Sequence, residues 1–75
     1  MARSAQRLVI CLKNEGYEVS LERRKVYVCI PDEAAAKHDL IKVIDESGDA
    51  YLFPIDYFAN IDLPPPVRRA VLTAA

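Results

Sequence analysis

The 75 residues are enough for one small domain, and 52% apolar with 28% charged residues indicates a compact globule rather than a disordered segment. No run approaches the roughly 18 consecutive apolar residues of a membrane span, and no secretion signal begins the chain, so we expect a cytoplasmic protein with no membrane partner. Ten Lys and Arg against eleven Asp and Glu give a net charge of -1, which disfavours nucleic acid as the main partner.

The two cysteines, Cys11 and Cys29, could pair in an oxidising compartment. A cytoplasmic chain keeps its thiols reduced, and buried thiols behave as small apolar side chains. We therefore expect two reduced thiols in the core and no disulfide.

The first predicted element is a buried strand over Arg7 to Lys13, which contains a run of branched apolar residues. A helix over residues 5–13 competes, because Ala5, Leu8, Val9 and Leu12 follow helical spacing and Gly16 could end it. Val-Ile-Cys is a poor helix-forming sequence, and this favours the strand.

Next, Tyr17, Val19 and Leu21 alternate with polar residues, which predicts a half-buried extended segment over residues 17–21. The charged residues 22–25 then interrupt the apolar pattern, as a turn would. The alternation resumes over residues 26–30 and predicts another strand, which Pro31 ends.

Residues 31–39 form a predicted loop with one helical turn, for which Asp32 is the expected N-cap. Residues 40–45 and 50–53 are predicted strands of a hairpin. Its turn is Glu46 to Asp49, where Gly48 can take the positive φ that a tight turn requires.

Residues 55–61 predict a turn followed by a brief final strand. Three consecutive prolines at residues 64–66 cannot donate to a sheet and favour a stiff polyproline segment. We expect one domain over residues 1–62, followed by a proline-rich segment and short tail helix over 63–75. That helix would start at Pro66 and place Val67, Ala70, Val71 and Ala74 on one face.

Short strands with short connections indicate an all-β class and a small barrel. Within this order, residues 51–58 read Tyr-Leu-Phe-Pro-Ile-Asp-Tyr-Phe and resemble the closing segment of Src-homology-3 domains. An acidic loop over Asn14 to Glu18 and a diverging turn over Leu21 to Lys25 are similar to that family in order. The resemblance covers about residues 7–62 and implies a five-stranded Src-homology-3-like barrel.

A second likeness concerns Gly16 to Phe58. This segment resembles a group of short uncharacterised bacterial proteins in its phrases Ile30-Pro31-Asp32 and Val43-Ile44-Asp45-Glu46-Ser47-Gly48. The likeness implies no activity.

Catalysis requires a nucleophile with a base, paired carboxylates or a cofactor loop, and the sequence assembles none of them. His38 is the only histidine and is interpreted as a solvated loop residue. Its spacing from the two cysteines matches no zinc motif. We expect no enzyme activity, no cofactor and no metal site.

The resemblance implies a binding face for a peptide or another protein. Pro54 and Tyr57 would line a shallow apolar groove, beside an acidic loop that attracts a basic ligand residue. The predicted binding residues are Glu15, Tyr17, Glu18, Pro54 and Tyr57. The structural alternative is that Tyr57 caps the core, Pro54 sets a turn and the glutamates are solvated.

Two further interactions stay open at this point. A small nucleic-acid-associated barrel could use the turn Arg23, Arg24 and Lys25 together with Tyr27, although a charged turn is the commoner explanation. The tail helix could join two copies in a homodimer by burying Val67 and Val71.

Overall fold

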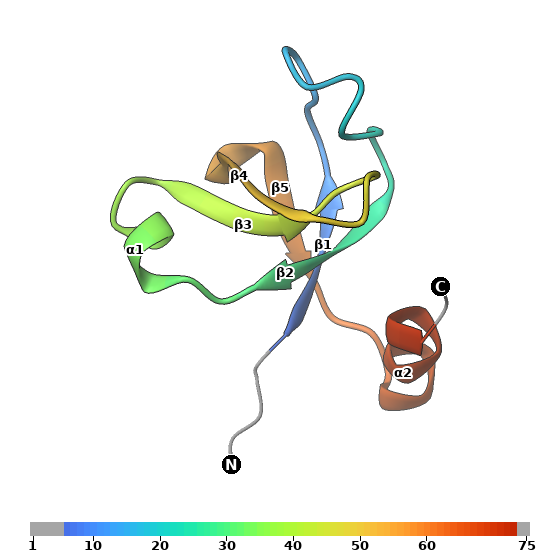
Figure 1. Ribbon diagram of the computed structural model, residues 1–75. Helices are drawn as coiled ribbons and strands as arrows, with labels where there is room; N and C mark the ends of the chain where they lie inside the picture. Colours follow the sequence, from blue (N-terminus) through green and yellow to red (C-terminus); the bar gives the residue numbers. More distant parts are fainter. Residues whose placement is uncertain (1–5, 74–75) are drawn as a thin grey trace.

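The computed structural model describes residues 6–73 and shows five strands in one antiparallel sheet of order β4-β3-β2-β1-β5, followed by a C-terminal helix (Figure 1). The elements are β1 (Arg7–Cys11), β2 (Val26–Ile30), α1 (Glu33–Ala36), β3 (Leu40–Ile44), β4 (Ala50–Pro54), η1 (Ile55–Tyr57), β5 (Phe58–Ile61) and α2 (Pro65–Thr73). The fold is therefore mostly β, as the sequence predicts.

One face of the sheet forms the core, because alternate residues of each strand point to the same side. The register pairs Val9 with Tyr27, and Cys29 with Val43. The buried cluster consists of Val9, Cys11, Leu21, Tyr27, Cys29, Ile41, Val43, Phe53 and Phe58. Leu21 is the one member that comes from a loop rather than a strand.

The first element is a strand, and the competing helix prediction is wrong for residues 7–11; Ala5 lies outside the described residues. β1 is an inner strand of the sheet, since it pairs with both β2 and β5. A strand bonded on both edges satisfies its backbone groups, so branched residues are better placed here than in a helix.

The two predicted turns around β3 are confirmed. Asp32 caps α1 by accepting a hydrogen bond from Ala35 N–H at 3.0 Å, and this bond lowers the pKa of Asp32. The β3–β4 hairpin turns over residues 46–49, where Gly48 has φ 88°. Both turns fix the direction in which β3 and β4 run.

The predicted extended segment over Tyr17 to Leu21 is wrong. Residues 12–25 form a long loop whose turns are closed by bonds from Ser20 N–H and Leu21 N–H to Tyr17 C=O. Leu21 is fully buried while Val19 is 95% exposed, so these residues do not share a face. Local turn bonds compete with strand pairing here, and an alternating pattern cannot distinguish the two.

The sheet is not closed into a barrel, because β4 and β5 are its two edge strands. The pairing runs from β4 through β3, β2 and β1 to β5, and η1 connects the two edges along the chain (Figure 1). The five predicted strands are present, but hydrogen-bonded closure is missing. This leaves backbone groups at both edges.

The C-terminal helix begins at Pro65, so the predicted polyproline segment is wrong for the last two prolines. Helix residues in the first turn need no N–H partner, which allows Pro65 and Pro66 at these positions.

Figure 1 shows α2 beside the sheet rather than on its core face. Val67 is exposed, Val71 is half-buried, and Ala74 lies outside the described residues. The Arg68 guanidinium donates to Gln6 C=O.

The thiols are both buried and unpaired. Cys29 lies opposite Arg7 in the register, and Cys11 is four residues further along β1. That offset corresponds to ~13 Å, well beyond the span of a disulfide. Burial raises the pKa of Cys11, so this side chain stays a protonated thiol in the core.

Within residues 6–73, no helix combines the length and apolar character needed to cross a lipid bilayer.

Candidate functional site: an aromatic surface beside β4

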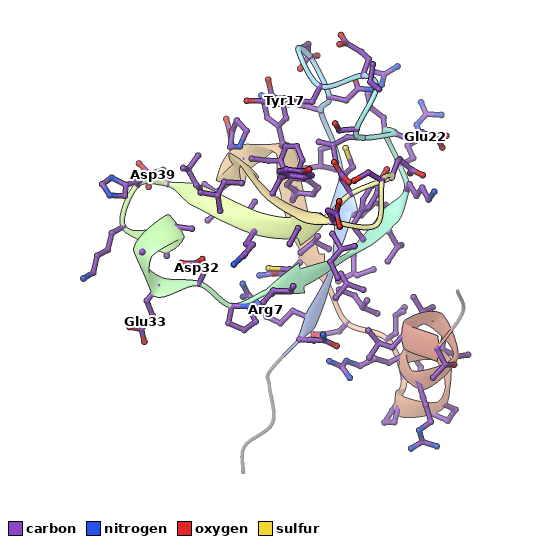
Figure 2. The ribbon with its side chains drawn as sticks, in the orientation of Figure 1. Arg7, Tyr17, Glu22, Asp32, Glu33 and Asp39 are labelled. Carbon is purple, nitrogen blue, oxygen red and sulfur yellow. The ribbon has the colours of Figure 1, made fainter. Side chains whose placement is uncertain are left out.

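Three aromatic rings connect the 12–25 loop to the β4 end of the sheet. The Tyr17 ring lies edge-on to Phe53 at 5.2 Å and to Tyr57 at 6.0 Å between centroids. Figure 2 shows Tyr17 pointing from the loop toward β4. Edge-to-face contacts of this kind stabilise a pair of rings by about 0.5–1.5 kcal/mol beyond their burial. They hold an otherwise irregular loop against the sheet.

The loop is also fixed by a hydrogen bond from the Tyr57 hydroxyl to Glu15 C=O at 2.9 Å. Desolvation raises the pKa of Tyr57, and the nearby Glu15 carboxylate raises it further. The hydroxyl is therefore protonated and able to donate at neutral pH. This bond joins η1 to the acidic part of the loop.

A depression of about 360 Å³ lies between this loop and β4. Its lining consists of Tyr17, Ser20, Asp45, Ser47, Tyr51, Leu52 and Phe53. Tyr17, Tyr51 and Leu52 are 37%, 52% and 46% exposed, and they lie together around one depression rather than scattered singly over the surface. We call the group Tyr17, Tyr51, Leu52 and Phe53 the aromatic surface.

The neighbourhood of the aromatic surface is acidic. Glu15 and Glu18 flank Tyr17, Asp49 precedes β4, and Asp56 precedes Tyr57; all four are exposed. Asp45 lies in the depression and accepts a hydrogen bond from Ser47 N–H at 2.8 Å. The nearby cation Lys13 is 4.0 Å from Asp56. A positively charged ligand would therefore be attracted to this side of the protein.

The structure brings together three of the predicted binding residues, namely Glu15, Tyr17 and Tyr57. Glu18 is on the same loop, where its carboxylate accepts from Gly16 N–H at 3.3 Å. Pro54 is half-buried at the end of β4, directly before η1. The chain has no Trp, so the second aromatic wall of a Src-homology-3 groove is missing. Their role in binding stays a prediction.

Sequence reasoning missed the β4 side of this surface. The sequence predicts Tyr51 and Leu52 only as part of a strand, and their exposure depends on β4 being an edge strand. The adjacent apolar residues Tyr51, Leu52 and Phe53 do not alternate with polar residues. That departure from a half-buried pattern is the signal that could have identified them.

The alternative nucleic-acid residues are arranged differently. Tyr27 is only 5% exposed, and its hydroxyl accepts from Glu22 N–H at 2.7 Å and donates to Glu46 at 2.6 Å. A ring buried in this way offers no face to a base. Arg23 and Arg24 remain exposed.

Lys25, the third cation of that turn, is paired with Glu46 at 2.6 Å and lies 5.7 Å from the centre of the Tyr27 ring. The hydrogen bond from Lys25, together with that from Tyr27, lowers the pKa of Glu46. The same bond raises the pKa of Lys25, while burial and then Glu46 raise that of Tyr27. These groups form a structural network.

Among residues 6–73, no group of three or more His, Cys, Asp and Glu side chains is arranged to hold a metal ion. His38 is exposed in the turn after α1.

No protein family, curated protein or solved structure matches the chain.

Proposed function

We propose that this protein is a non-enzymatic interaction module that binds an extended, positively charged segment of another protein at the aromatic surface. The observation that carries the proposal is the depression beside β4, where exposed Tyr17, Tyr51 and Leu52 meet an acidic rim. Aromatic anchors in a depression are typical of binding hot spots, and opposite charge accelerates and orients the encounter.

We further propose that the open sheet is a variant of the Src-homology-3 fold. The strand order, the long loop between β1 and β2, and the short η1 before β5 support this. Tyr17, Pro54 and Tyr57 then occupy the side on which that family binds peptides. Because no Trp supplies the second wall, the ligand is expected to use β4 instead.

The test is an NMR titration of the ¹⁵N-labelled protein with pools of synthetic hexapeptides. One pool contains two arginines and varied apolar residues, and the matched pool contains two glutamates instead. We expect the arginine pool to shift the amide resonances of Tyr17, Tyr51 and Leu52, and to bind more weakly as salt is raised.

Two variants of the same loop sharpen the test. Tyr17→Ala removes an exposed ring of the aromatic surface and should abolish the shifts. Val19→Ala changes a side chain of the same loop that is 95% exposed and lies outside the depression, so binding should persist. Equal binding of the glutamate pool would contradict the proposal. Shifts confined to residues 23–27, with peptide or with short RNA and DNA, would instead favour the nucleic-acid alternative.

A second copy of the chain is the competing partner. The tail helix exposes Val67, which keeps the predicted homodimer open as an explanation. Sedimentation of the ligand-free protein separates the two explanations, because the proposed module is a monomer without ligand and the homodimer is not.

A further inference from the structure

The outer edge of β4 carries backbone groups that point away from the sheet. In an antiparallel ladder, residue pairs that exchange hydrogen bonds alternate with pairs that do not. Asp45 N–H donates to Asp49 C=O at one end of the β3–β4 ladder, and Ile55 N–H donates to Asp39 C=O at the other. The register between them pairs Ile41 with Phe53 and Val43 with Tyr51. These two pairs are therefore the bonded ones.

It follows that Ala50, Leu52 and Pro54 direct their backbone groups outward. Ala50 and Leu52 each present one N–H and one C=O, and Pro54 presents a C=O only. None of the turn and loop hydrogen bonds within residues 6–73 uses these groups. No strand lies beyond β4 in the sheet order of the described chain.

The edge of β5 is less accessible to a new strand. Leu12 N–H donates to Tyr57 C=O, so by the same alternation Phe58 and Asn60 point outward from β1. The Phe58 N–H is already bonded to Ile55 C=O. Only Asn60 then offers an outward donor from this short strand, against two donors on β4.

The side chains of β4 protect only one end of this edge. Edge strands are commonly protected by a charge, a bulge or a proline, and β4 reads Ala-Tyr-Leu-Phe-Pro, which carries no charge and has its proline at the C-terminal end. The aromatic surface lies directly beside this edge. A residue opposite Phe53 in an added strand would place its side chain on the same face as Phe53, where the depression is.

We propose that the ligand binds as an additional antiparallel strand on the outer edge of β4; this rests on the proposed function and specifies how the segment is held. The occupant is an extended segment of another protein with an apolar residue opposite Phe53. A basic residue two positions later lies opposite Tyr51, toward the end of β4 that the exposed Asp49 precedes. Backbone bonds to Ala50 and Leu52 give affinity, and the two side chains give specificity.

The experiment uses the tightest-binding arginine hexapeptide from the pools and two N-methylated forms of it. One form is methylated at the alternate amides that face β4, and the other at the remaining amides, with charge and side chains unchanged. We expect the form methylated at the amides that face β4 to bind at least about tenfold more weakly than the parent peptide. The other form should bind within about threefold of the parent. The Ala50 and Leu52 amide protons should shift downfield and exchange more slowly with the parent peptide.

Each other outcome has a distinct meaning. If the peptide shifts Tyr17 and Tyr51 but both methylated forms bind as well as the parent, strand addition is wrong and the proposed function stands. If no arginine peptide shifts the aromatic surface, both proposals are wrong. If the ligand-free protein sediments as a dimer with Ala50 and Leu52 already protected, the occupant is a second copy and the inference is overturned.

Discussion

Two of the contacts that attach the 12–25 loop to the sheet differ in how completely they are closed. At its C-terminal end, Leu21 is fully buried and the Tyr27 hydroxyl has partners on both sides, Glu22 and Glu46. At its centre, Tyr17 contacts two rings but remains 37% exposed beside an open depression. Both attachments depend on a tyrosine. Tyr27 is buried and its hydroxyl is bonded within the protein, whereas part of the Tyr17 ring is left open to a ligand.

This difference separates stability from recognition. Substitutions at the closed attachment should reduce the free energy of unfolding with little direct effect on a ligand. Substitutions at the open attachment should reduce binding and lower the free energy of unfolding by less. The substitutions below test this separation, from the largest expected effect to the smallest.

The largest effect is expected for Leu21→Ala. Removing a fully buried leucine side chain leaves a cavity under the loop and should destabilise the protein by about 2–5 kcal/mol. Urea denaturation followed by circular dichroism measures this. If Tyr17→Ala lowered the free energy of unfolding by a comparable amount, the two attachments would contribute equally to stability. The proposed difference between them would then be wrong.

Tyr27→Phe should have the next largest effect. It removes the hydroxyl that accepts from Glu22 N–H and donates to Glu46, leaving a partly buried N–H unsatisfied, at a cost of about 1–3 kcal/mol. Tyr57→Phe is the matched control, because its hydroxyl makes one exposed bond to Glu15 C=O and should cost below about 1 kcal/mol. Equal losses in urea denaturation would contradict the distinction.

The pH dependence of stability tests Glu46. Its folded pKa is lowered by Lys25 and Tyr27, so the unfolded chain binds the proton more tightly than the folded one. The contribution is complete above the unfolded pKa of about 4.3 and is lost as the pH falls through the lower folded value. Between pH 6 and pH 3, the melting temperature should fall more steeply for the wild type than for Glu46→Gln. Parallel curves would show that the network does not stabilise the fold.

Val19→Ser should have the smallest effect. This side chain is 95% exposed and lines neither the core nor the depression, so stability should change by less than about 0.5 kcal/mol. Peptide binding should also be unchanged. A measurable loss of either property would show that the middle of the loop is ordered by contacts with a ligand or a second molecule.

The strands and tight turns were predictable from the sequence because their signals are local. The branched residues of the strand predicted over Arg7 to Lys13, the N-cap at Asp32 and the turn glycine at Gly48 each specify neighbouring backbone. The structure confirms the cap, the turn and the strand, which ends at Cys11. The prediction of an extended segment over residues 17–21 is wrong, because turn bonds at Tyr17 C=O, rather than strand pairing, determine which side chains are buried.

The candidate site was predictable only in part. The family resemblance predicts that Glu15, Tyr17 and Tyr57 lie together, and they do meet. The importance of Tyr51 and Leu52 depends on β4 being an edge, which is a property of the whole sheet. Likewise, the partner of Tyr27 is Glu46, 19 residues away, and no local pattern contains that pairing.

Pro54 has a consequence for solubility. An uncharged, exposed edge strand is a site at which identical chains can stack into aggregates. Pro54 offers no N–H at one end of the β4 edge, and residues 55–57 turn the chain away immediately afterwards. The edge can therefore accept a short segment but is too short to seed an extended ladder between copies. A substitution of Pro54 by Val, which restores the donor, would be expected to increase aggregation on heating.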